Sequence, residues 1–313
     1  MTRVSVVMPV FNGETYLRKA IESILGQSYA DFEFVIVDDG STDGSLEIIE
    51  DYAARDARIV VHKMPQNSGI VAALNAGIGA ANGEYIARMD ADDTSMPSRL
   101  EKQVAYLDET GIAAVGANYI KFRGDKAKGR ATKRPLSSAE VKRTLPYACC
   151  LGHPVVMYRK DVFDRVGGYD PNYASGGAED YDLWLRMSLD HDLANLEEPL
   201  LRYRVHSESL TAHSDAGDRY AFNSACAVAN YFCTLLDLPP VFPQDGSDAI
   251  VKAIGLALGQ ARDEDQRKCL MRWNVRFARY CLAGPQERVR AKAILTDFGT
   301  FREKWKWRVY GLG

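Results

Sequence analysis

"RVSVVMPVFNGETYLRKAIESILGQSYADFEFVIVDDGSTD", residues 3–43, changes from one periodic pattern to another and back, and this change decides the fold class. Residues 3–10 form a short β-branched run broken by Pro9 and a turn, which predicts a strand. Residues 14–28 place apolar side chains at helical spacing, and residues 32–43 form a second apolar run that ends in acidic and small residues. The stretch therefore predicts a strand, a helix and a second strand.

The alternation continues to residue 93. Helical patterns at 44–56 and 69–81 lie on either side of a strand pattern at 58–64, and a fourth strand pattern follows at 83–93. This order predicts an α/β fold with a Rossmann-like, mostly parallel central sheet that is flanked by helices on both faces.

Strand and helix patterns persist to residue 206, and the segments from about residue 213 onward have helical patterns. We therefore expect an α/β domain at 1–212, with halves at about 1–95 and 96–212, and a helical C-terminal region at 213–313. A stretch rich in proline and glycine at 237–248 predicts a domain boundary or hinge.

The composition is that of an ordinary globular protein. The 313 residues are 46% apolar and 26% charged, and the formal net charge of −3 gives no general case for nucleic-acid binding. The first residues lack the pattern of a signal peptide, and no apolar run approaches eighteen residues. The six cysteines have no metal-binding spacing, so we expect reduced thiols in a cytoplasmic protein.

Polar residues follow three of the predicted strands at the point where each strand ends. These stretches are "PVFN" (9–12), "DDGSTD" (38–43) and "MDADD" (89–93). Because ligands of parallel α/β sheets bind outside the carboxyl ends of the strands, the three stretches predict a binding site at that edge.

The acids of these stretches allow two interpretations each. Thr42, Asp43 or Ser45 can cap the next helix, and since a cap needs only one acid, we expect Asp39 to accept a hydrogen bond from a base or a sugar hydroxyl. The carboxylates in "MDADD" repel one another, and either water in an open turn or a divalent cation can relieve that repulsion. Oxygen-rich clusters suit Mg²⁺ or Mn²⁺.

Several motifs together resemble the family 2 glycosyltransferases, which are inverting, nucleotide-sugar-dependent enzymes with the GT-A fold. Residues 4–45 and 67–93 carry the N-terminal motifs. "GHPVVMYRK" (152–160), "AEDYDLWLRM" (178–187) and "YRVHSES" (203–209) follow in the order typical of the family. The resemblance covers roughly the first 210 residues.

The resemblance implies a role for particular residues. Asp180 would be the general base, with Glu179 as the less favoured alternative. Asp92, Asp90 and His206 would hold Mn²⁺ or Mg²⁺, and Asp93 is the less favoured ligand. The nucleotide sugar would contact Pro9, Val10, Phe11, Asn12, Asp39, Asp90, Ala91 and Asp92.

Other interpretations of the same residues remain open. Glu179 and Asp180 can be acids that favour the first turn of a helix, His153 and His206 can be structural, and Trp184 is expected in the core. The basic loop at 121–134 and the tail with Trp305 and Trp307 can be solvated or can contact a membrane surface. Many relatives have arginine where this chain has Leu74, which puts a diphosphate contact there in doubt.

We therefore expect a metal-dependent inverting glycosyltransferase. It would move sugar from a UDP-sugar to a hydroxyl of a glycan or lipid-linked glycan, in surface polysaccharide or lipopolysaccharide synthesis, in the cytoplasm or peripherally at the inner membrane face. The alternatives are a non-catalytic nucleotide-sugar or glycan-binding module and a sugar nucleotidyltransferase. The second is disfavoured because no glycine- and Arg/Lys-rich loop follows the first strand.

Overall fold

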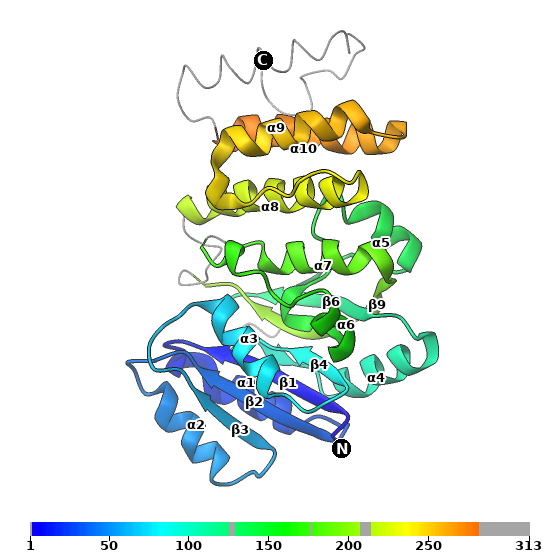
Figure 1. The fold of residues 1–313 in the computed structure, drawn as a ribbon. Helices are drawn as coiled ribbons and strands as arrows, with labels where there is room; N and C mark the ends of the chain where they lie inside the picture. The colour runs from blue at the N-terminus through cyan, green and yellow to red at the C-terminus, as the bar shows by residue number, and fades with distance from the viewer. Residues whose placement is uncertain (1, 125–128, 176, 207–213, 282–313) are drawn as a thin grey trace.

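The computed structural model describes residues 2–124, 129–175, 177–206 and 214–281 (Figure 1). Two sequence-based expectations fall outside these ranges, namely those for the middle of the basic loop at 125–128 and for Trp305 and Trp307. No helix among the described residues has the length and apolar character that crossing a membrane requires.

Within the described residues, the strands form one sheet in the order β3-β2-β1-β4-β8-β6-β9-β5, and β7 pairs with β6. The strands β1 to β4 are mutually parallel and β6 is parallel to β9, whereas β8, β5 and β7 run antiparallel to their neighbours. The predicted α/β fold with a Rossmann-like parallel part is therefore confirmed, and the sheet as a whole is mixed. The strands are β1 (Val4–Val10), β2 (Phe32–Asp38), β3 (Ile59–Lys63), β4 (Tyr85–Arg88), β5 (Thr94–Ser95), β6 (Ala114–Phe122), β7 (Arg130–Ala131), β8 (Met157–Arg159) and β9 (Leu193–Arg204).

Helices cover both faces of the sheet (Figure 1). The helices of the α/β part are α1 (Glu14–Leu25), α2 (Ser45–Ala53), α3 (Ile70–Ala80), α4 (Arg99–Thr110), α5 (Ser138–Thr144), α6 (Lys160–Arg165) and α7 (Glu179–Asp190). Successive residues of a strand point to opposite faces, so Val6 and Met8 pack with α1 and α4, whereas Val7 packs with α3. This burial on both faces explains why β1 reads as a continuous apolar run.

The sequence analysis missed α5, β5 and β7. The strands β5 and β7 have two residues each, too few for a period of two to show. Helix α5 did carry a signal: Ser137 and Glu140 form a capping box, in which each side chain bonds the backbone N–H of the other residue.

The C-terminal helices α8 (Ser214–Leu235), α9 (Gly246–Gln260) and α10 (Glu264–Cys281) stack beyond α7 (Figure 1). They share a core with the α/β part, because Trp184 of α7, which was expected in the core, is buried in the same cluster as Val228 and Ile254. The break predicted at 237–248 separates α8 from α9. A hydrogen bond attaches this connecting segment to α8, since the N–H of Val241 donates to Asn230 Oδ1 at 2.6 Å. The helical region is therefore packed onto the sheet domain.

Candidate active site

The parallel pairing of β2, β1 and β4 brings the three polar stretches to one edge of the sheet, as the sequence predicted. Asn12 joins the loops after β1 and β2. Its Oδ1 accepts from the N–H of Thr42 at 2.8 Å, and its own N–H donates to Ser41 Oγ at 3.1 Å. The neighbouring Phe11 is 46% exposed, whereas Val10 is buried. Phe11 therefore presents an aromatic ring at this edge.

Asp39 has a structural role that the sequence did not reveal. Its side chain is buried, and its two carboxylate oxygens accept the N–H groups of Ser68 at 2.8 Å and Gly69 at 2.9 Å. It therefore fixes the loop that leads into α3. The expected helix cap at "STD" is made by Asp43, whose Oδ1 accepts the N–H of Ser45 at 3.0 Å.

The acids of "MDADD" converge. One oxygen from each of Asp90, Asp92 and Asp93 lies within 4.8 Å of the others. His206, at the end of β9, is brought to this cluster, and its Nε2 lies 2.8 Å from Asp92 Oδ2. The structure therefore joins Asp92 to a histidine that is 114 residues away in the chain.

Asp93 was expected to be the less favoured ligand, and its two carboxylate oxygens have different surroundings. Its Oδ1 accepts the N–H of Arg204 at 2.8 Å, which ties the acidic loop to β9. Its Oδ2 is buried without a hydrogen-bond partner among the described residues. Burial, followed by the charges of Asp90 and Asp92, raises the pKa of Asp93 well above its ordinary value. An orphaned carboxylate oxygen, neighbouring carboxylates and an imidazole form a donor set that fits Mn²⁺ or Mg²⁺.

A buried arginine that sequence reasoning missed lies under the cluster. Arg88, the last residue of β4, is 2% exposed, and its Nη1 forms an ion pair with Asp90 Oδ2. Arg99 of α4 is also buried and donates to the carbonyl oxygen of Arg88 at 2.6 Å. A signal was available, because an arginine at the end of a fully buried strand must have a partner nearby. The positive charge of Arg88 partly offsets the negative charge of the acidic loop at 90–93.

Glu179 and Asp180 begin α7 directly after two residues with positive φ, Gly177 (+80°) and Ala178 (+73°). Glu179 is buried, and its Oε1 lies 3.6 Å from His153 Nδ1. Burial, and then the charge of Asp180, raises the pKa of Glu179 to about 7. The burial of Glu179 and its raised pKa are not explained by the preference of acids for the first turn of a helix.

Asp180 is half-buried and also has a raised pKa, chiefly because of burial. The Sγ of Cys149 lies 3.8 Å from Asp180 Oδ2 and donates to it. His153 is neutral, because burial, followed by the charge of Arg88, lowers its pKa well below the ordinary value, and its Nε2 lies 2.8 Å from the hydroxyl of Tyr169. The neutral His153 therefore lies beside Glu179 without forming an ion pair with it.

Leu74 is fully buried in the core. It offers a ligand no polar contact. The doubt raised by the sequence about a diphosphate contact at this position is therefore confirmed by the burial of the side chain.

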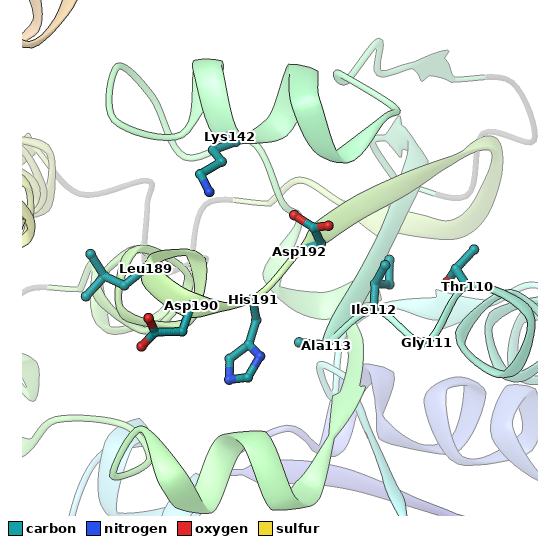
Figure 2. Close-up of a pocket in the computed structure, with 9 residues that line it drawn as sticks. All are labelled: Thr110, Gly111, Ile112, Ala113, Lys142, Leu189, Asp190, His191 and Asp192. Carbon is teal, nitrogen blue, oxygen red and sulfur yellow. The ribbon is translucent and has the colours of Figure 1, made fainter.

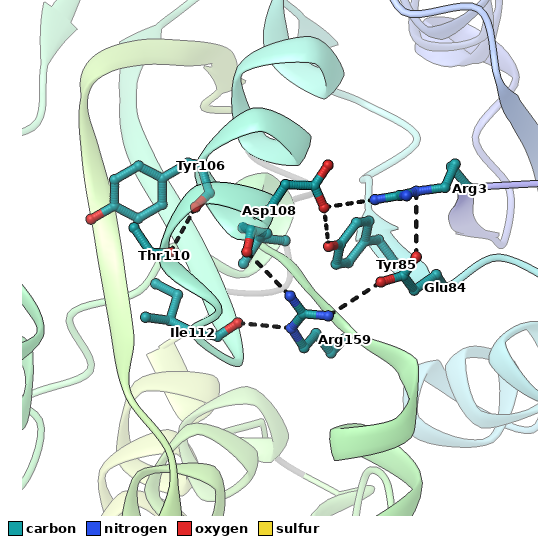
Figure 3. A network of polar contacts seen from close by, with 9 residues as sticks. Arg3, Glu84, Tyr85, Tyr106, Asp108, Thr110, Ile112 and Arg159 are labelled. Carbon is teal, nitrogen blue, oxygen red and sulfur yellow. Dashed lines mark hydrogen bonds and ion pairs between the residues drawn. The ribbon is translucent and has the colours of Figure 1, made fainter.

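Two polar features lie at the other edge of the sheet. A hollow of about 290 Å³ is lined by Ile112, Lys142 and His191, before the amino ends of β6 and β9 (Figure 2). Arg3 and Tyr85 both donate to Asp108 Oδ1 at 2.6 Å, which fastens α4 to the start of β1 and β4 (Figure 3). Neither belongs to the site at the carboxyl edge.

Two acidic groups at the carboxyl edge of this mixed sheet are typical of a GT-A glycosyltransferase. The fold is shared with S. aureus TarS (residues 1–349, solved with UDP), at a TM-score of 0.61 and 17% identity over 94% of this chain and 88% of that one. It is also shared with the mannosyltransferase PcManGT of Pyrobaculum calidifontis (solved with GDP-Man and Mn²⁺), at a TM-score of 0.55 and 18% identity over 95% of this chain and 79% of that one.

The chain belongs to glycosyl transferase family 2, whose family model matches residues 5–167. It is 35% identical to the putative glycosyltransferase EpsE of Bacillus subtilis (strain 168), over 76% of this chain and 84% of the relative. It is 34% identical to the O-antigen biosynthesis glycosyltransferase WbnJ of Escherichia coli, over 66% of this chain and 81% of the relative. The resemblance inferred from the motifs is confirmed.

Proposed function

We propose that this protein is a metal-dependent, inverting glycosyltransferase that moves a sugar from a UDP-sugar to a hydroxyl of a glycan or lipid-linked glycan. The observation that carries the proposal is the presence of two acidic groups, the cluster of Asp90, Asp92 and Asp93 and the pair Glu179 and Asp180, that both feel the charge of the buried Arg88. Arg88 forms an ion pair with Asp90, and its charge also acts on Glu179 and Asp180. The UDP in TarS and the O-antigen role in the name of WbnJ support the donor and the acceptor class.

The donor side consists of the loops after β1, β2 and β4. The exposed ring of Phe11 and the loop fixed by Asp39 are the parts of this side that would meet the nucleotide. A bound Mn²⁺ or Mg²⁺ would offset the negative charge that develops on the departing diphosphate. In this proposal Asn12, Asp39, Ala91 and the backbone around Pro9, Val10 and Phe11 line the nucleotide, Asp90 faces the ribose, and Asp92, Asp90 and His206 hold the cation.

The acceptor side consists of the start of α7. Asp180 accepts the proton of the acceptor hydroxyl as its oxygen attacks the anomeric carbon from the face opposite the diphosphate, which inverts the configuration. A carboxylate suits this task when a buried setting raises its pKa toward neutrality, as burial does for Asp180 and Glu179. Glu179, which lies beside the neutral His153, is the alternative base.

Transfer is expected to increase with pH and to level off above about pH 7. The proposed base Asp180 must be ionised to accept a proton, and burial raises its pKa; the neighbouring Glu179, the alternative base, has a pKa of about 7. Because this folded-state pKa is raised, the group's contribution to the free energy of unfolding is present at acid pH and lost as the pH rises through about 7. The pH dependence of kcat measures the effect, and Glu179→Gln should move its midpoint to lower pH. A flat profile between pH 5.5 and 8 would contradict the assignment.

Thermal unfolding in the presence of UDP-sugars and GDP-sugars, with and without Mn²⁺, is the test of the proposed function. A UDP-sugar at about one hundred times its Kd should stabilise the protein by about 2.7 kcal/mol, and only when Mn²⁺ is present. Release of UDP with candidate glycan acceptors then separates an enzyme from a binding module. Stabilisation that is independent of metal would refute metal dependence.

A cytoplasmic location, with peripheral contact at the inner face of the membrane and a role in surface polysaccharide or lipopolysaccharide synthesis, completes the proposal. Co-sedimentation of the full chain with anionic liposomes tests the membrane contact, and recovery of all the protein in the supernatant would refute it.

A further inference from the structure

Helix α8 of the C-terminal region fixes the loop that leads into the acidic pair. Asn223 of α8 is buried, and its Nδ2 donates to the carbonyl oxygens of Ser175 at 3.1 Å and Gly177 at 2.8 Å. The loop needs such support because Gly177 and Ala178 both have positive φ, which is unfavourable for alanine. A helix outside the sheet domain therefore contributes to the position of Glu179 and Asp180.

Tyr220 lies on the same face of α8, one turn before Asn223. A Cβ added at Gly177 would be 3.3 Å from Cδ2 of the Tyr220 ring, so the ring lies directly against the loop. Tyr220 is 38% exposed, although other large aromatic residues of α7 and α8, such as Trp184 and Phe232, are buried. Part of this ring is therefore open to solvent beside the start of α7.

Tyr220 belongs to the side of the site that contains Asp180. The ring lies against Gly177, two residues before Glu179, and burial, followed by the charges of Cys149 and Asp180, raises the pKa of Tyr220. The exposed Phe11 lies at the other side, in the loop after β1 with the donor-binding residues. The two exposed aromatic residues thus frame different parts of the site.

We propose that Tyr220 is the aromatic wall of the acceptor subsite, on which a pyranose ring of the glycan acceptor stacks while its hydroxyl reaches Asp180. This inference rests on the proposed function and adds a substrate-binding residue from the C-terminal helices. The C–H groups of a pyranose face are apolar and can cover the exposed part of an aromatic ring.

The test compares Tyr220→Phe, Tyr220→Leu and Tyr220→Ala, using p-nitrophenyl β-glycosides of glucose, galactose and N-acetylglucosamine as acceptor probes. Loss of the ring should raise the acceptor KM about tenfold, as expected for an aromatic contact of about 1.4 kcal/mol, whereas phenylalanine should preserve it. The Kd for UDP with Mn²⁺ should stay the same in all three variants. Tyr106→Ala on α4 is the matched control and should leave both constants unchanged.

The outcomes separate stacking from mere packing against the loop. If Tyr220→Leu restores the acceptor KM, or if the variants lower kcat with an unchanged acceptor KM, the ring only supports the loop and the inference is overturned. It is also overturned if the wild-type protein binds UDP with Mn²⁺ but uses none of the three glycosides. Absence of UDP binding to the wild-type protein would instead refute the proposed function.

Discussion

Replacing Asp92 by alanine is expected to abolish the metal-dependent part of UDP binding and to lower transfer about a thousandfold, the size of effect seen when one electrostatic group that stabilises a transition state is removed. Asp92 is the carboxylate of the cluster that lies 2.8 Å from His206, and it is partly exposed at the rim. Asp90, in contrast, is already paired with Arg88. Asp92 therefore has the charge and access to bind a cation.

Isothermal titration with UDP, in Mn²⁺ and in EDTA, measures this effect. Asp161→Ala is a suitable control, since Asp161 is an exposed acid on α6 that pairs with Arg165 and should leave UDP binding unchanged. If UDP binds equally well with and without metal, and regardless of Asp92, the Asp-x-Asp motif does not hold a cation and the proposed donor site is wrong.

Replacing Asp180 by asparagine should preserve donor binding and lower transfer about 10²- to 10⁴-fold, the usual contribution of a positioned general base. The amide is nearly the same size as the carboxyl group but cannot accept the proton of the acceptor hydroxyl. The N–H of Tyr181 donates to Asp180 Oδ1 at 2.7 Å, and an amide oxygen can accept the same bond, so the start of α7 should be retained.

The matched variant Glu179→Gln decides which of the two acids is the base. We expect it to keep more transfer activity than Asp180→Asn, because Glu179 is more deeply buried and faces His153. Single-turnover rates at saturating UDP-sugar compare the two variants without a contribution from donor affinity. If Asp180→Asn turned over like the parent while Glu179→Gln did not, Glu179 would be the base.

Most of the sheet domain was predictable, because each element carries a local signal. Residues 4–93 alternate between runs that are apolar on both faces and amphipathic runs, and the structure has β1 to β4 and α1 to α3 there. The order of parallel strands then places their carboxyl ends at one edge. The acids of "MDADD" were therefore predicted to lie near those of "DDGSTD" before any contact was known.

Interactions that depend on tertiary packing were not predictable in the same way. The ion pair between Arg88 and Asp90 is local in sequence, but only the burial of β4 on both faces makes it obligatory. The hydrogen bonds that Asp39 makes to the loop before α3 depend on how that loop crosses the end of β2. Such contacts have no periodic pattern.

The sequence by itself determined the α/β class, the edge of the sheet that carries the site and the types of acid found there, because these follow from hydrophobic periodicity and the geometry of parallel strands. Only the tertiary structure decided that Arg88 is buried against Asp90, that Asp39 fixes the loop before α3 and that α8 brings Tyr220 beside the start of α7. The packing of a shared core brings these segments together in space, and no local sequence pattern records that packing.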